Sequence, residues 1–285
     1  MSTLTPAIEK KRDRLLEILY GYGRVAVAFS AGVDSTLVAK AAYLACGADA
    51  IAVTAESLSL AEGELDEARQ LAERIGIRHI ILSTQEFSDS NYLKNPTNRC
   101  YFCKSELYSR LTELAPTLGV DVLANGANLD DCGDYRPGMQ AAVEYQVRSP
   151  LVEAELSKSE VRELAKFWDL PVWDKPATPC LSSRIAYGVE VTPERVRRID
   201  QAERFLKQLL DLRELRVRCE ANDLARIEIP LEAVPRILSP ALRDRVRSEL
   251  HTLGFQYVTV DLDGFRSGSM NGVISAEQLL GVNSR

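Results

Sequence analysis

The stretch "RVAVAFSAGVDST" (24–36) decides the fold, because a short apolar run passes directly into a turn of small residues. Its first part, "RVAVAF" (24–29), is typical of a strand buried on both faces of a parallel sheet. We expect a helix to begin near Thr36. A strand that turns straight into a helix leaves main-chain N–H groups pointing at one spot, with the helix dipole behind them. The stretch therefore predicts an anion-binding loop.

The loop "SAGVDST" (30–36) differs from the two commonest nucleotide loops. It lacks the Gly-Lys-Ser/Thr of a Walker loop and the triple-glycine spacing of a dinucleotide fold. A glycine-containing turn without a ligand is the alternative interpretation. The position directly after the first strand favours the anion site.

The chain up to about residue 170 alternates apolar runs with helical patterns. A capping box, "SKSE" (157–160), precedes one helix, and Gly76 stands where the helix expected within 61–75 should end. The alternation predicts an α/β fold with a doubly wound, mostly parallel sheet and a ligand site at the carboxyl ends of its strands. The further strands are expected in "DAIAVTA" (49–55), "RHIILST" (78–84) and "DVLANG" (121–126).

The pattern changes from about residue 190. Thr192 and Pro193 are a good N-cap and first residue for a helix that runs to about Leu210. We expect a first domain over 1–185 and a smaller α+β domain over 186–285 that binds substrate or forms an oligomer, joined through a flexible loop over 175–188. The other elements of this part are expected in "LRVRCE" (215–220), "LARIEI" (224–229), 240–252 and "QYVTVDLD" (256–263).

Composition excludes several classes of protein. The 285 residues carry a net charge of −6, whereas a protein that holds duplex DNA or tRNA through phosphates needs a basic face. Residues 1–14 are polar, and no apolar run approaches the roughly 20 residues of a membrane span. We therefore expect a cytoplasmic protein with neither a nucleic-acid nor a membrane partner. Beyond residue 190 every basic side chain except Lys207 is Arg, which suits either a small-anion site or solvated helix faces.

The six cysteines do not suggest a secreted disulfide scaffold. Cys46 and Cys219 stand in apolar patterns and are expected to fill the core. In "NRCYFCK" (98–104), Cys100 and Cys103 share one face of a helix start, where the dipole favours thiolate. Cys180 lies in the loop between the domains, where neighbouring hydroxyls and an arginine favour a reactive thiolate that delivers sulfur. The Cys100–Cys103 pair can be part of a metal site, a redox couple or a chance arrangement.

The loop resembles S-G-G-x-D-S, the pyrophosphate loop of the ATP pyrophosphatase (PP-loop) superfamily, whose members adenylate a substrate oxygen and release pyrophosphate. The resemblance implies that ATP phosphates are held here, with Asp34 acting through Mg²⁺. Ala31 replaces the usual first glycine, which matters only if this position needs a positive φ. The implied phosphate-binding residues are Ser30, Gly32, Asp34 and Ser35.

Five motifs together resemble the LarE family of sulfur transferases over nearly the whole chain. That family acts in making the nickel-pincer nucleotide cofactor of lactate racemase. The resemblance implies that ATP adenylates a carboxylate of pyridinium-3,5-biscarboxylic acid mononucleotide, that a sulfur nucleophile displaces AMP, and that the second carboxylate follows. It also implies a homo-oligomer and a sulfide or another sulfur donor. The motifs are "FSAGVDS", "NRCYFCK", "GANLDDCGDYRPG" (126–138), "PCLSSRIAYG" (179–188) and "LARIEI".

The same resemblance implies further binding residues. Acidic and basic residues that follow the fourth strand would form the mouth of the site, where the sheet's ligand crevice is expected. They are Asp130, Asp131, Asp134 and Arg136. Three arginines are candidates to bind the substrate phosphate, with a plain surface salt bridge as the alternative for each. They are Arg184, Arg218 and Arg226.

Members of the family occur in two forms. In one, the residue equivalent to Cys180 gives up its own sulfur and becomes dehydroalanine after a single turnover. In the other, three cysteines hold an iron–sulfur cluster, and Cys100, Cys103 and Cys180 match that form. Three thiolates on a 4Fe–4S cluster leave one iron free to carry an extra sulfide, and we favour this repeating route.

Two other uses of the cysteines stay open. The Cys100–Cys103 pair could reduce a persulfide on Cys180, or a zinc ion could be bound. Zinc needs a fourth ligand, and the only two histidines, His79 and His251, lie far from these motifs in the sequence.

Three rival functions remain. A tRNA or other thiolase would use the same loop and cysteines, but a tRNA enzyme should be basic. An amidating ligase would use ammonia and ignore Cys180. A nucleotide-binding module would bind ATP without releasing pyrophosphate.

Overall fold

The computed structural model describes residues 4–133, 137–266 and 270. Two compact units form within the chain. The first unit comprises the described residues of Met1–Ser57, Gly63–Glu86 and Cys100–Thr178. The second comprises those of Leu58–Glu62, Phe87–Arg99 and Pro179–Arg285. The expected boundary at residue 185 stays a prediction.

The first unit is built on a parallel sheet of four strands in the order β3-β2-β1-β4. Val25 in β1 pairs with Ala50 of β2 on one side and with Val122 of β4 on the other. The chain thus moves outward in both directions from β1, which confirms the doubly wound α/β fold. The strands are β1 (Val25–Ala28), β2 (Ala50–Glu56), β3 (Arg78–Ser83) and β4 (Val122–Ala124).

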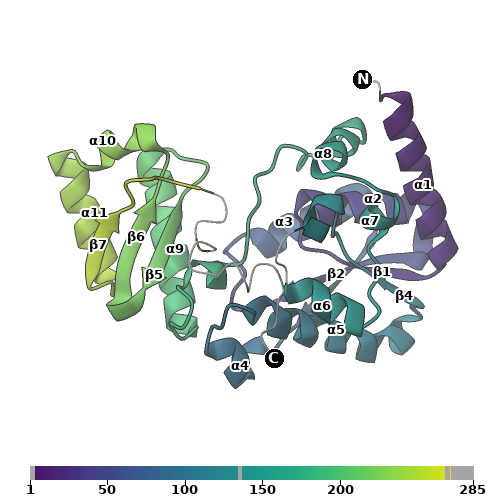
Figure 1. Cartoon of the computed structure of the whole chain (residues 1–285), viewed down its shortest axis with the longest axis horizontal. Helices are drawn as coiled ribbons and strands as arrows, with labels where there is room; N and C mark the ends of the chain where they lie inside the picture. The colour runs from purple at the N-terminus through teal and green to yellow at the C-terminus, as the bar shows by residue number, and fades with distance from the viewer. Residues whose placement is uncertain (1–3, 134–136, 267–269, 271–285) are drawn as a thin grey trace. The chain divides into compact units, whose positions relative to one another are not determined.

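Helices cover both faces of this sheet (Figure 1). Val25 and Val27 of β1 belong to one core, while Ala26 between them belongs to the other. A strand buried on both faces reads as a continuous apolar run, which is why "RVAVAF" predicted it. The first core packs against α1 (Pro6–Tyr22), α2 (Val33–Cys46), α3 (Glu64–Ile75), α7 (Pro150–Glu153) and α8 (Lys158–Phe167), and the second against α5 (Arg99–Leu118) and α6 (Pro137–Glu144).

The helix ends follow the capping signals. Gly76 ends α3 with a φ of 83°, as expected of a glycine C-cap. The capping box before α8 forms, because Ser157 accepts the N–H of Glu160 and the Glu160 carboxylate accepts the N–H of Ser157. Helix α2 begins at Val33, three residues before the predicted start, and Gly32 is its N-cap.

The second unit contains a three-stranded sheet in the order β5-β6-β7. Strands β5 (Arg216–Glu220) and β6 (Leu224–Glu228) are antiparallel, and β7 (Tyr257–Val260) runs parallel to β6. The predicted α+β pattern of this part is therefore confirmed. The helices of the unit are α4 (Ser90–Leu93), α9 (Pro193–Leu210), α10 (Val234–Ile237) and α11 (Pro240–Thr252).

Two cysteines lie in the interiors of the units. Cys219 in β5 is fully buried, and burial raises the pKa of its thiol to about 11. Cys46 at the end of α2 is half-buried against the first core, and burial raises its pKa as well. Both residues fill apolar space, as predicted. Within the described ranges, no helix combines the length and apolar character needed to cross a membrane.

Candidate active site

The turn between β1 and α2 has a backbone conformation that favours glycine. Ala31 lies there with a φ of 58° and its side chain is only 1% exposed. The position does need a positive φ, which costs an alanine about 1–2 kcal/mol. The turn directs the chain into α2, whose first N–H groups lie at the carboxyl end of β1.

Ser35 closes this loop through three hydrogen bonds. Its Oγ accepts the N–H of Ser30 at 3.1 Å, lies 3.1 Å from Ser30 Oγ, and donates to the carbonyl of Gly32 at 3.2 Å. The four residues predicted to hold phosphate therefore lie together at the start of α2. Their role in binding ATP stays a prediction.

Asp34 is the charged group of the loop, and two residues from distant parts of the chain bind its carboxylate. Asn128 donates to Asp34 Oδ1 at 3.1 Å, and Lys158 Nζ forms an ion pair with Asp34 Oδ2. The Asp34 side chain is 23% exposed. A partly exposed carboxylate at a helix N-terminus can exchange its lysine for a metal ion that carries phosphates.

A second lysine lies beside the loop. Lys175 Nζ is 3.4 Å from the carbonyl oxygen of Ala31 and 2.6 Å from Glu67 Oε2. Sequence reasoning missed both lysines. The signal for Lys158 was its place in "SKSE", which predicted only a helix cap, and Lys175 carried no pattern that could have found it.

The turn after β4 brings two predicted acidic residues to this site. Asp131 Oδ2 accepts the N–H of Asn128 at 3.0 Å, which fixes the residue that binds Asp34. Asp130 Oδ2 accepts the N–H of Lys158 at 2.8 Å, at the first turn of α8. Asp130 and Asp131 therefore position Asn128 and Lys158. The predicted residues Asp134 and Arg136 lie outside the described residues.

Gly126 lies against the start of α2, where a side chain has no room. A Cβ atom there would lie 2.8 Å from the main-chain nitrogen of Ser35 and 3.0 Å from its Cα. We expect Gly126→Ala to displace the loop and to weaken ATP binding about tenfold or more, since such overpacking costs about 1–3 kcal/mol. Isothermal titration with ATP and Mg²⁺ measures this. Gly21→Ala, where nothing lies within 4 Å of the new methyl group, is the matched control; equal ATP affinity in both variants would contradict the prediction.

The three cysteines of the predicted cluster are divided between the units. Cys100 and Cys103 lie near the start of α5 in the first unit, Cys100 exposed and Cys103 partly so. Cys180 lies in the second unit as the N-cap of a 3₁₀ turn over Leu181–Arg184. Among the residues that the structure describes, no group of three or more His, Cys, Asp or Glu side chains is arranged to hold a metal ion. The iron–sulfur site stays a prediction.

The three arginines predicted to bind the substrate phosphate are ion-paired within the second unit. Arg184 pairs with Glu203 at 3.0 Å, and Arg218 pairs with Glu228 at 2.8 Å, both with little exposure. Arg226 is more exposed and pairs with three carboxylates, those of Glu220, Glu228 and Asp261. Phosphate binding by these arginines also stays a prediction.

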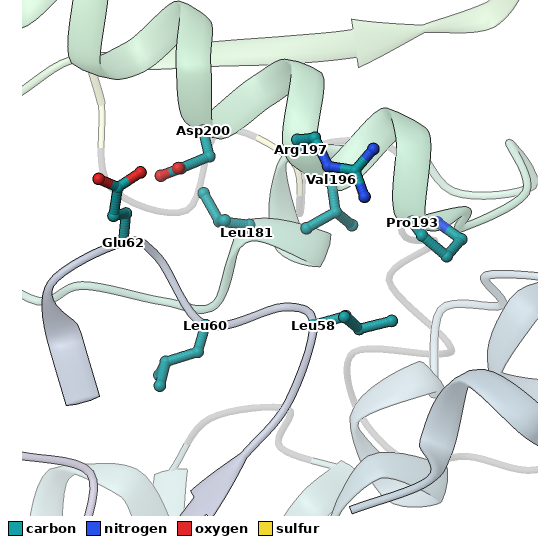
Figure 2. Close-up of a pocket in the computed structure, with 8 residues that line it drawn as sticks. All are labelled: Leu58, Leu60, Glu62, Leu181, Pro193, Val196, Arg197 and Asp200. Carbon is teal, nitrogen blue, oxygen red and sulfur yellow. The ribbon is translucent and has the colours of Figure 1, made fainter.

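A small cavity lies within the second unit, with a volume of about 190 Å³. Figure 2 shows Leu181 and Val196 on its wall together with Arg197 and Asp200 of α9. Burial raises the pKa of Asp200. Leu181 directly follows Cys180, so one wall of the cavity continues into the chain that carries this thiol.

Similar proteins identify the family. No family model matches the chain. An uncharacterized protein of Synechocystis sp. is 46% identical over 268 residues, which covers 94% of this chain and 99% of the relative. Pyridinium-3,5-bisthiocarboxylic acid mononucleotide synthase of Lactiplantibacillus plantarum is 40% identical over 271 residues, which covers 94% of this chain and 96% of the relative. The chain belongs to the LarE family.

More distant relatives of this LarE family member support its α/β fold. A tRNA-specific 2-thiouridylase of Beijerinckia indica is 31% identical over 192 residues, which covers 53% of this chain and 44% of the relative. The LarE family and this thiouridylase are ATP-dependent sulfurtransferases of the PP-loop superfamily. The resemblance read from the phosphate loop and the cysteine motifs is therefore confirmed at the level of the family.

Proposed function

We propose that this chain adenylates the carboxylates of pyridinium-3,5-biscarboxylic acid mononucleotide and converts them to thiocarboxylates. The observation that carries this proposal is the 40% identity with the named synthase over 94% of the chain. The first unit supplies the anion loop that such a reaction requires. We place the reaction in the synthesis of the nickel-pincer nucleotide cofactor of lactate racemase, in the cytoplasm, by a homo-oligomer that uses sulfide or another sulfur donor.

The first chemical step uses the loop at the start of α2. The N–H groups of the loop and the helix dipole attract the phosphates of ATP. Asp34 would hold Mg²⁺, which would supply positive charge for the phosphates, and Lys158, which pairs with Asp34, could then donate to the phosphates. A substrate carboxylate oxygen attacks the α-phosphorus, the bond to the β-phosphate oxygen breaks, and pyrophosphate leaves. Lys158 then stabilises the charge that develops on the leaving pyrophosphate.

The second step replaces AMP by sulfur. A hydrosulfide ion attacks the carbonyl carbon of the acyl adenylate, the bond from that carbon to the AMP oxygen breaks, and AMP and a proton are released with the thiocarboxylate. The thiols of Cys100, Cys103 and Cys180 would hold the iron–sulfur cluster, which supplies this sulfide when bound. Thiol donors on a helix start and an N-cap suit such a cluster. Repetition on the second carboxylate gives the dithio product.

One set of contacts within the second unit joins residues that are close in the sequence to Cys100 and to Cys180. Arg99 Nη1 donates to the carbonyl of Ser182 at 2.7 Å and to Asn95 Oδ1 at 2.6 Å. Cys100 is the residue after Arg99, and Cys180 lies two residues before Ser182. Within the second unit, one residue of each cysteine motif is therefore joined to the other by a hydrogen bond.

The proposal is tested with anaerobically purified protein that has been reconstituted with iron and sulfide. We expect pyrophosphate and AMP to be released when ATP, Mg²⁺ and the biscarboxylic acid mononucleotide are present, and mass spectrometry to find oxygen replaced by sulfur. Omission of sulfide should stop the second step. Nicotinic acid mononucleotide, which lacks one carboxylate, is the control substrate. An amide product with ammonia, or ATP binding without pyrophosphate release, would instead identify one of the rival functions.

A further inference from the structure

We propose that the buried pair of Arg184 and Glu203 positions Cys180 for sulfur transfer, an inference that rests on the proposed function. The two side chains are 2% and 4% exposed and lie in the second unit with Cys180. Residues 179–184, here called the Cys180 loop, were expected to be a flexible junction. Hydrogen bonds instead tie this loop to several parts of its unit.

Arg184 binds the chain on both sides of the thiol. Its Nη1 donates to the carbonyl of Pro179 and, at 3.1 Å, to the carbonyl of Cys180. These carbonyls belong to the two peptide groups that flank the Cys180 Cα. Because each peptide group is planar, fixing both of them fixes the backbone torsions of Cys180 and hence the direction of its Cα–Cβ bond.

Glu203 holds the guanidinium in place. Its Oε1 accepts from Arg184 Nε at 3.0 Å and also from the main-chain N–H of Val217 at 3.1 Å. Helix α9 and strand β5 therefore share one carboxylate that orients Arg184. A buried ion pair of this kind contributes little net stability compared with apolar side chains of the same size. Its defined geometry is the property that an apolar pair could not supply.

The rest of the Cys180 loop is held in the same manner. The N–H of Leu181 donates to the carbonyl of Ser59 at 2.9 Å. Arg218, itself paired with the fully buried Glu228, donates to the carbonyl of Ser183 at 3.1 Å. The Cys180 side chain remains partly exposed. The backbone of the Cys180 loop is thus hydrogen-bonded on both sides of Cys180.

Arginine is the side chain that this arrangement requires. Its planar guanidinium carries donors on separate nitrogens, so it can bind a carboxylate on one edge and main-chain carbonyls on the other. The Lys ammonium places its donors on one atom and cannot span these acceptors. Arg184→Lys therefore keeps the charge and removes the geometry.

The test compares Arg184→Lys with Arg236→Lys. Arg236 also binds main-chain carbonyls, those of Leu209 and Leu210, at the end of α9. We expect Arg184→Lys to lower kcat for the thio product about 10²-fold, the cost of misplacing a reacting group by about 1 Å. The amount of thio product formed per pyrophosphate released should fall as well, which places the loss in the sulfur step. The rate at which iodoacetamide alkylates Cys180, measured by mass spectrometry of its peptide over a range of pH, should change in Arg184→Lys and not in Arg236→Lys.

A second variant keeps the test decisive if Arg184→Lys does not fold. Glu203→Gln retains an acceptor for Arg184 Nε and for Val217, and we expect it to change the same alkylation rate in the same direction. Parent-like rates of alkylation and of thio-product formation in a folded Arg184→Lys or Glu203→Gln protein would overturn the positioning role. If the parent protein makes no thio product, the proposed function fails, whereas the alkylation comparison still decides whether the pair positions Cys180.

Discussion

We expect replacement of Cys180 with alanine to abolish formation of the thio product, while substrate-dependent pyrophosphate release continues. The physical reason is that, in the proposed reaction, adenylation uses the loop at the start of α2 in the first unit, whereas the thiol serves the sulfur step. Separate assays for pyrophosphate and for the thiocarboxylate distinguish the two halves of the reaction. Loss of both activities in a folded variant would mean that the thiol also takes part in adenylation.

Cys132→Ala is the matched control, since this exposed cysteine has no assigned role. It should retain both activities, and full multiple-turnover activity in Cys180→Ala would contradict the entire assignment of the cysteines. Iron content separates the two routes for sulfur. If Cys100→Ala, Cys103→Ala and Cys180→Ala each lose iron after reconstitution, the three thiols hold a cluster. If the parent protein binds no iron, Cys180 should appear as dehydroalanine after one turnover.

The second large effect is expected at Lys158, which forms the ion pair with Asp34 in the phosphate loop. Lys158→Ala should lower the rate of substrate-dependent pyrophosphate release about 10²–10³-fold, the usual effect of removing one donor that stabilises a developing negative charge. The thiol of Cys180 should react with iodoacetamide as in the parent protein. Steady-state kinetics with varied ATP measures the loss.

Lys166→Ala is the control for this prediction. Lys166 lies on the same helix, α8, and its ammonium packs over the ring of Trp173 at 4.6 Å from the ring centre. Its removal changes the charge of the protein equally without touching the loop. If both variants release pyrophosphate at the same rate, Lys158 binds Asp34 without serving the reaction.

Local signals predicted most of the fold. Thr192 and Pro193 marked the start of α9 because both signals are local. The Thr192 side chain accepts a main-chain N–H of the first turn, and the proline ring fixes φ at a helical value. The strand runs were recognisable because both faces of the parallel sheet are buried. The start of α2 was placed too late, since its N-cap is Gly32, which gives no side-chain signal.

Long-range contacts of the candidate site were beyond the sequence. Asn128 and Lys158 meet Asp34 from 94 and 124 residues away, and no local pattern encodes such a contact. The arginines of the second unit were recognised as a group, but their carboxylate partners depend on the register of β5 with β6 and on the orientation of α9. The sequence alone does not show what each arginine contacts, so it could not distinguish an arginine that binds a ligand from one that binds the main chain.

The segment Phe87–Arg99 belongs to the second unit although it lies between two parts of the first. Asn95 donates to the carbonyls of Ile185, Ala186 and Val189, about 90 residues further along, and the Tyr92 hydroxyl lies 2.8 Å from Ser182 Oγ. A gene fusion or domain exchange with one cut site would therefore separate the Cys180 loop from side chains that support it. The smaller unit is therefore not encoded by one continuous stretch of the sequence.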